Sequence, residues 1–247
     1  MYLKTQALVL RVTDYNDKDA LLTLLTPEHG KLTAKARGLR RKNSPLIAPC
    51  QLLAYGEFVL FDYRGSYTVN EASSLELFQP LRKDLCALSL GTYFAQVAEL
   101  ICQEDLPNPE LLSLVLNCLY GLSKLNLSQE KVKAVFELRA ACLAGYMPDL
   151  VGCHVCGDQR PDLFDLSAGQ LECGRCRSYQ SNGIRMPVNE ALIQAMRYIA
   201  MCDSKRLFAF ELGQENLTVL SQITEGYLCM QLERGFSALD FYKSLLI

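Results

Sequence analysis

Histidine is scarce in this sequence, with only His29 and His154 among 247 residues. Neither histidine has a serine, cysteine or carboxylate arrangement nearby that would recommend a catalytic site, and no phosphate-cradling glycine loop is present. The formal net charge of −2 excludes a generally basic nucleic-acid-binding protein, so any such binding must depend on a local group of cations. We therefore expect a protein that is not an enzyme.

A long hydrophobic segment is also absent. The most apolar run, Ala87 to Cys102, contains Gln96 and Glu99 and is too short to span a bilayer. The opening residues, MYLKTQALVL, have neither the basic region nor the cleavage site of a signal peptide. These features predict a cytoplasmic protein with no membrane contact.

Cysteine, in contrast, is abundant, with 11 residues. Seven are scattered singly, mostly among apolar neighbours, which indicates reduced, buried thiols in a cytosolic setting. These seven are Cys50, Cys86, Cys102, Cys118, Cys142, Cys202 and Cys229.

The other four cysteines form two C-x-x-C pairs, Cys153 with Cys156 and Cys173 with Cys176. The separation of the pairs is typical of a four-cysteine zinc site, in which each pair grips one side of the ion. Four thiolates leave no open coordination position, so we expect one structural Zn²⁺ per chain. His154 would be a redundant fifth ligand and is expected to be an exposed loop residue.

Two other interpretations of the paired cysteines compete with a zinc site. Dithiol redox motifs would need a lowered thiol pKa and usually a single C-x-x-C beside a βαβ pattern, which is not seen here. Four unrelated buried thiols would not explain the paired spacing. Zinc is favoured over both, and three nearby cations are candidates to offset the charge of the cluster: Arg160, Arg175 and Arg177.

The first eighty residues read as five short antiparallel strands separated by turns. Five strands without an intervening helix predict a small barrel or sandwich, and they suit an OB-fold, which commonly binds single-stranded nucleic acid. The expected strands surround Leu8–Val12 and cover Ala20–Leu25, Lys31–Arg37, Gln51–Tyr63 and Tyr67–Phe78, with a hairpin turn at residues 64–66.

The third expected strand and the loop after it carry six cations and no acidic residue. We call this set the basic track: Lys31, Lys35, Arg37, Arg40, Arg41 and Lys42. Period-two alternation puts the strand cations on one face, where they would contact phosphates, and Phe61, Tyr63 and Tyr67 would supply stacking surfaces for bases. The competing interpretation is a solvated strand edge, with the aromatic residues in the core.

The pattern changes near Pro80 to apolar residues at helical spacing. The expected architecture is α+β: an OB-fold at residues 1–79, then a helical domain at residues 80–247 with the zinc module inserted at about 150–180. The expected helices cover Leu81–Ile101, Leu111–Leu122, Gln129 to about Gly145 with Ser128 as N-cap, Pro187–Ala200, and Gln214–Leu232.

Taken together, the chain resembles the RecO recombination-mediator family of bacterial DNA repair, over nearly its full length. Four stretches carry the resemblance, and with all four cysteines present the chain looks like a zinc-containing member. They are residues 6–44, residues 136–157 (FELRAACLAGYMPDLVGCHVCG), residues 171–176 (LECGRC) and residues 227–239 (YLCMQLERGFSAL).

The resemblance implies binding to single- and double-stranded DNA, annealing of complementary strands and a nucleoid-associated location. It also implies partnership with RecR, contact with the carboxy-terminal tail of single-strand-binding protein, and help in loading RecA. Carried onto this sequence, the DNA contacts fall on the basic track, and Lys133 and Arg139 are candidates to meet the tail's carboxylates. Two rivals stay open: a zinc-containing protein-interaction scaffold without direct DNA binding, and a thiol-dependent redox enzyme.

Overall fold

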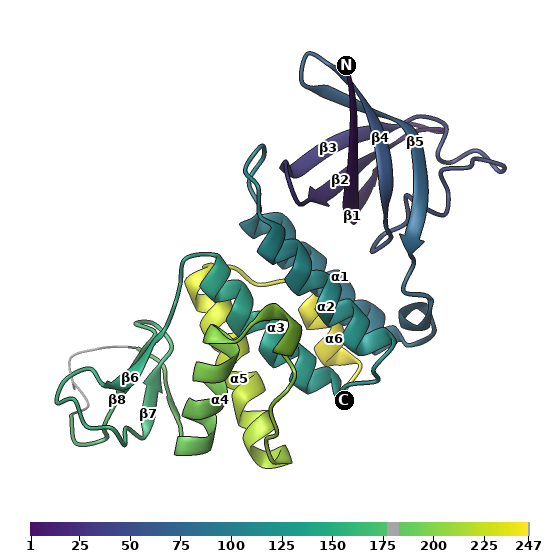
Figure 1. Ribbon diagram of the computed structural model, residues 1–247. Coiled ribbons are helices and arrows are strands. Elements are labelled where there is room, and N and C mark those ends of the chain that lie inside the picture. The colour runs from purple at the N-terminus through teal and green to yellow at the C-terminus, as the bar shows by residue number, and fades with distance from the viewer. Residues whose placement is uncertain (177–182, 247) are drawn as a thin grey trace. The chain divides into compact units, whose positions relative to one another are not determined.

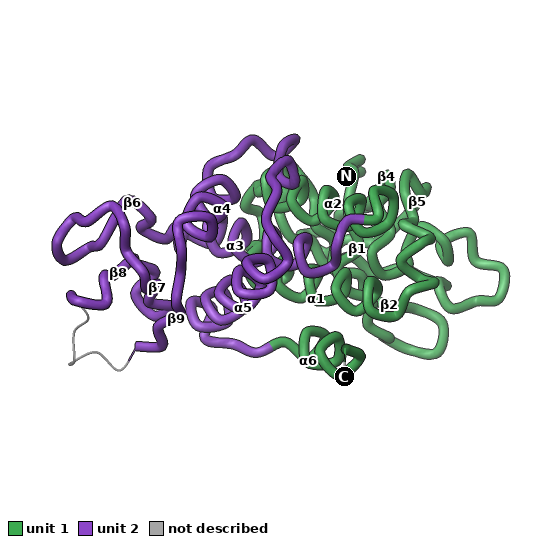
Figure 2. Tube along the Cα trace, turned by 90° about the horizontal axis from the view of Figure 1, so that it is seen from below, with its two compact units in different colours: residues 1–126, 236–247 green, residues 127–235 purple. Residues whose placement is uncertain are grey.

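The computed structural model describes residues 1–176 and 183–246 (Figure 1). The chain forms two compact units, one of residues 1–126 with 236–247 and the other of residues 127–235 (Figure 2). The expected boundary at residues 79 and 80 falls inside the first unit, where strands give way to helices.

Five strands of the first unit close into a barrel in the order β1-β2-β3-β5-β4, which confirms the predicted five-stranded barrel. Along β3 and β4, alternation places every second side chain in the interior, whereas β2 is buried at almost every position. On β3, for example, Leu32, Ala34 and Ala36 are buried, while Thr33 is exposed. The strands are β1 (Tyr2–Asp14), β2 (Ala20–Thr26), β3 (Gly30–Ala36), β4 (Tyr55–Tyr63) and β5 (Ser66–Glu76).

The closure of the barrel departs from the predicted all-antiparallel arrangement. Strands β3 and β5 pair in parallel, with Ala34 opposite Tyr67 and Lys35 opposite Thr68. Strand β1 pairs with both β2 and β4, and its pairing with β2 shifts register between Val9 and Arg11. Such a bulge bends a strand, which suits a 13-residue strand that has to serve two neighbours.

Helices complete the first unit. The carboxylate of Asp84 accepts the N–H of Cys86 at 2.9 Å and caps α1, and Asn108 caps α2 in the same way. Helix α6, which the sequence reasoning missed, packs on α1, where the rings of Tyr93 and Phe236 lie 5.3 Å apart. The elements are η1 (Gln79–Lys83), α1 (Leu85–Ile101), α2 (Pro109–Ser123) and α6 (Ser237–Ser244).

The second unit is built on α3 and α5, which pack together with both apolar residues and the buried polar contacts of Lys133 and Glu137 between them. Ser128 is the N-cap of α3, as predicted. The predicted start of α4 at Pro187 is wrong, because Pro187 ends a strand and Asn189 caps the helix. The helices are α3 (Gln129–Leu143), α4 (Glu190–Met201), η2 (Ser204–Arg206) and α5 (Gln214–Gln231).

A small sheet of order β6-β8-β7-β9 lies between α3 and α4 in the chain and carries the paired cysteines. Its short strands lack a period long enough to be recognised from sequence, so they were not predicted. They are β6 (Asp149–Cys153), β7 (Leu163–Asp165), β8 (Gln170–Glu172) and β9 (Arg185–Pro187). None of the helices in the described part of the chain has both the length and the apolar character to traverse a bilayer.

Candidate metal centre and nucleic-acid interface

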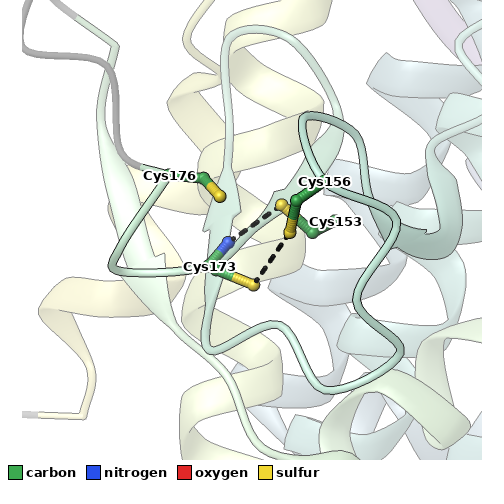
Figure 3. A group of neighbouring side chains, drawn as sticks. All are labelled: Cys153, Cys156, Cys173 and Cys176. Atoms are coloured by element: carbon green, nitrogen blue, oxygen red, sulfur yellow. Dashed lines mark hydrogen bonds between the residues drawn. The ribbon is translucent and has the colours of Figure 1, made fainter.

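The four cysteines of the two C-x-x-C pairs converge on one point (Figure 3). All four sulfur atoms lie within 4.8 Å of one another, and the sulfurs of Cys156 and Cys173 are 3.9 Å apart. Sulfurs bound to one tetrahedral zinc ion, at Zn–S distances of about 2.3 Å, would lie about 3.8 Å from each other. The donor set and its spacing therefore fit a single metal ion.

Each pair is held by a tight turn. The N–H of Gly157 donates to the carbonyl of Cys153 at 2.8 Å, and the N–H of Cys176 donates to the carbonyl of Cys173 at 2.9 Å. Gly157 has φ +74°, a backbone conformation that other residues rarely adopt. The N–H of Cys173 also donates to the sulfur of Cys153 at 3.3 Å, so the backbone supports negative charge on that sulfur.

The thiols differ in their readiness to ionise. Burial acts to raise the pKa of Cys153, but the N–H groups of Cys156, Cys173 and Val155 outweigh it and lower this pKa to about 6. Burial, reinforced by the neighbouring thiols of Cys153 and Cys156, raises the pKa of Cys173 to about 12. Four thiolates this close repel one another, so their joint ionisation requires a cation among them.

A buried ionic network supports the strands beside the cysteines, and the sequence reasoning missed it. Arg185 on β9 donates through Nε to Glu172 at 2.7 Å and lies 3.3 Å from Asp165. All three side chains are buried, so each charge depends on its partners for solvation. The network joins β7, β8 and β9, and Glu172 directly precedes Cys173.

The His154 and Arg175 side chains, near the two C-x-x-C pairs, contact a backbone carbonyl and carboxylates and not the sulfur atoms. His154 is an exposed turn residue, as predicted: it lies 3.3 Å from the carbonyl of Leu171 through Nδ1 and 3.9 Å from Glu172 through Nε2, and it is not a member of the four-sulfur cluster. Arg175 pairs with Asp158 at 3.5 Å. Arg177 lies outside the described residues.

The module is braced against α4 and α5. Arg197 of α4 donates to the carbonyls of Leu150 and Val151 at 2.7 and 2.9 Å. The rings of Phe164 on β7 and Tyr227 on α5 meet edge to face, 5.5 Å apart. Loss of the metal would therefore affect the helices as well as the loops.

Three cations of the basic track are engaged within the first unit. Lys31 donates to the carbonyl of Glu99 at 3.2 Å. Lys35 lies 3.2 Å from a carboxylate oxygen of Asp19, and Arg40 lies 3.0 Å from Asp14. The Arg40–Asp14 pair is exposed, whereas the Lys35 side chain is only 28% exposed and is covered by a tyrosine ring.

Asp19 also holds the backbone of the track. The N–H of Gly38 and the side chain of Asn16 donate to its carboxylate, and with Lys35 they lower its pKa to about 2. The loop after β3 is thereby tied to the loop between β1 and β2. Asp19 acts as a structural anchor as much as a counter-charge.

The other three cations, Arg37, Arg41 and Lys42, are exposed and form no ion pair with any residue in the described ranges. Arg37 and Arg41 line an open groove of about 650 Å³ between the loop after β3 and strand β5. Polar groups of both walls face the same space, including Asn43, Asn70 and the carboxylate of Glu71. The groove combines cations with amides able to hydrogen-bond bases.

The two candidate partner-binding residues are both engaged inside the second unit. Lys133 is 3% exposed and lies 3.0 Å from Glu137 and 2.8 Å from Glu225, so it is not available to an outside carboxylate. Burial outweighs the attraction of Lys133 and raises the pKa of Glu137 to about 6. Arg139 donates to the carbonyls of Ile199 and Ala200 at the end of α4. Assigning Lys133 to a surface contact is therefore wrong.

Comparison with known proteins agrees with this architecture. Two family models match, the N-terminal model of recombination protein O over residues 1–78 and the C-terminal model over residues 82–240. The DNA repair protein RecO of Acetivibrio thermocellus is 34% identical, with 99% of this chain and 97% of that protein covered. The RecO proteins of Alkaliphilus metalliredigens (29%; 99% and 100%) and Bacillus subtilis (27%; 92% and 88%) are also similar. The chain belongs to the RecO family of recombination proteins.

Proposed function

We propose that this chain is a non-catalytic DNA-binding mediator of DNA repair and homologous recombination. It binds single- and double-stranded DNA, anneals complementary strands and helps load RecA onto DNA coated by single-strand-binding protein. RecR and the carboxy-terminal tail of single-strand-binding protein are its partners, and Zn²⁺ is the metal of the four-cysteine centre. Membership of the RecO family supports this proposal, and the cationic groove of the barrel is the observation that carries it.

The groove offers charge where phosphates can reach it. Arg37 and Arg41 form no ion pair with a carboxylate among the described residues, and Lys42, the next residue, is exposed as well. Arg40 has to leave Asp14, but an exposed pair of this kind contributes only about 0–1 kcal/mol. Lys31 and Lys35 are half-buried as well as paired within the unit, and they contribute less. Effective phosphate contacts are therefore expected from Arg37, Arg41, Lys42 and Arg40.

Annealing follows from the same charges. Two complementary strands repel each other through their phosphates, and a cationic surface that contacts both backbones lowers this repulsion. The protein needs no bond-making step for this, which is consistent with the absence of a catalytic arrangement noted in the sequence. The zinc ion, closed in by four thiolates, holds the module of the second unit together.

The tail of single-strand-binding protein is proposed to bind the second unit. Since Lys133 is buried, we assign the tail to another site, an apolar groove of about 610 Å³ along α4. Tyr198 and Met201 line one side of this groove, and Phe210 and Leu212 line the other. Its apolar lining suits the hydrophobic residues of an acidic-hydrophobic tail.

The proposal is tested with the double variant Arg37→Ala/Arg41→Ala in titrations with labelled single-stranded DNA at several salt concentrations. Each lost phosphate contact should reduce the slope of log K against log salt by about 0.7–0.9. The matched control, Lys83→Ala/Lys124→Ala, removes the same charge from elsewhere in the first unit and should leave the slope unchanged. An unchanged slope in the groove variant, or no DNA binding by the zinc-loaded protein, would favour the interaction-scaffold alternative.

A further inference from the structure

Three aromatic side chains form an exposed patch on the outer surface of the barrel, away from its core. Tyr2 is 61% exposed, Phe61 40% and Tyr63 63%. Tyr2 and Phe61 are register partners on β1 and β4, with ring centroids 5.4 Å apart. Phe61 and Tyr63 are two residues apart on β4 and share its outer face. Isolated exposed aromatics are ordinary, but a contiguous group of three indicates an interaction surface.

The turn beside this aromatic patch is rigid. Arg64 and Gly65 have φ of 53° and 80°, as a two-residue type I′ hairpin requires. The carboxylate of Asp62 accepts the N–H of Gly65 at 2.9 Å, and the Arg64 guanidinium lies 5.5 Å from the centre of the Tyr63 ring. A ring and a cation are thus held together at the surface, a combination that suits a base and its phosphate.

Strand register connects the aromatic patch to the cationic groove. Phe61 on β4 is opposite Thr68 on β5, and Thr68 is opposite Lys35 on β3. Phe61 is therefore two strands away from β3 around the closed barrel, with β5 between them. Arg37 follows on from β3 and lines the groove together with Asn70 of β5. Strand β5 therefore lies between the aromatic patch and the groove, and a bound single strand would cross it to reach both.

We propose that Tyr2, Phe61 and Tyr63 stack the bases of single-stranded DNA whose phosphates lie over Arg37 and Arg41. This inference rests on the proposed function and assigns a second part to its DNA site. A duplex keeps its base faces inside the helix, so the patch adds affinity for single strands alone. Stacking on rings is tolerant of base identity, which suits a protein that acts on any sequence.

Tyr67, the other aromatic residue of the same hairpin, has a different role. It is half-buried, packs against the barrel core, and its pKa is raised by burial and by the nearby carboxylates of Asp62 and Asp105. Of the three rings expected to stack bases, Phe61 and Tyr63 therefore remain in the proposed site and Tyr67 does not. Tyr2 is the third ring of the site.

The first test uses the absence of tryptophan from this chain. A Phe61→Trp variant carries a single tryptophan, whose fluorescence reports stacking directly. Addition of an oligo(dT) of about 16 nucleotides, the upper end of the site size of one OB-fold, should quench this fluorescence. A blunt duplex of the same length should bind with little quenching.

The second test measures affinity. Tyr63→Ala should weaken oligo(dT) binding by roughly 5- to 150-fold, the range for loss of one stacked base, and leave duplex affinity unchanged. Tyr63→Phe, which keeps the ring, should bind as the unsubstituted protein does. Tyr120→Ala removes a comparably exposed ring from α2, at 49% exposure, and should change neither affinity. Circular dichroism confirms that each variant is folded.

The outcomes separate this inference from the proposed function. If the unsubstituted protein binds neither DNA form, the proposed function fails and this inference fails with it. If the protein binds DNA through Arg37 and Arg41, but tryptophan at position 61 is not quenched and Tyr63→Ala keeps its single-strand affinity, only the stacking assignment is overturned. Loss of RecR binding by Tyr63→Ala with unchanged DNA affinity would likewise overturn it, and would assign the patch to a protein contact.

Discussion

The cations of the barrel and those of the second unit belong to the same residue types but differ in solvent exposure and pairing. Arg37 and Arg41 are exposed beside an open groove, whereas Lys133 and Arg185 are almost fully buried between carboxylates. Burying a charge costs several kcal/mol unless partners replace the lost water. The buried cations therefore stay paired with their carboxylates and are not available to a ligand. The exposed ones keep their hydration and can exchange it for phosphate. The difference shows that availability to a ligand depends on desolvation and not on residue type.

The largest effect that would sharpen this comparison is removal of the metal. Cys173→Ser should abolish binding of the metal that we propose to be zinc and unfold the module, because structural zinc contributes about 10–16 kcal/mol in small zinc-binding peptides. We expect a much lower thermal midpoint for the second unit and an unchanged one for the barrel. Zinc content by colorimetric assay and melting by circular dichroism are the measurements.

Cys202→Ser is the matched control, because this lone thiol in the same unit lies outside the cluster. It should keep both the zinc and the melting curve. A metal-free Cys173→Ser protein that melts as the unsubstituted protein does would show that the sulfur cluster is not needed for folding.

The next effect concerns the buried lysine. Lys133→Met removes the cation that lies between the carboxylates of Glu137 and Glu225 and should lower the free energy of unfolding by about 3–5 kcal/mol. The double variant Lys133→Met/Glu137→Leu, which removes both charges, should be less destabilised than the single variant. Urea unfolding monitored by circular dichroism measures both.

Glu211→Gln supplies the surface counterpart in the same unit, since this carboxylate is 99% exposed and 3.9 Å from Lys131. Its change should stay within about 0.5 kcal/mol. Equal effects of the buried and exposed substitutions would remove the distinction between the two kinds of cation.

The smallest effect is expected at the exposed pair of the barrel. Asp14→Asn frees Arg40 and should tighten oligo(dT) binding at low salt by at most about fivefold, the equivalent of a surface ion pair. High salt should erase the gain. Glu110→Gln changes the net charge equally from the start of α2, and a gain of the same size there would reject a specific role for Asp14.

Much of the architecture was predictable because its causes are local. The two C-x-x-C pairs, the N-cap at Ser128 and the turn at Arg64 and Gly65 are each set by a few neighbouring residues. Helix α6 and the strands of the metal module were not predicted, since an eight-residue helix and strands of three to five residues carry too little periodicity and depend on the surfaces that they meet. Arg185 was missed for a similar reason: a single arginine near a strand gives no sign of the two carboxylates that will enclose it.

The sequence by itself determined the barrel, the helical segments, the thiolate donor set and the concentration of cations between Lys31 and Lys42, because alternation, capping and cysteine spacing act over short distances. Only the tertiary structure decided which cations are available. Packing buried Lys133 and paired Lys35 with Asp19, while Arg37 and Arg41 were left facing a groove. Desolvation and pairing depend on residues far apart in the chain, and these come together only when it folds.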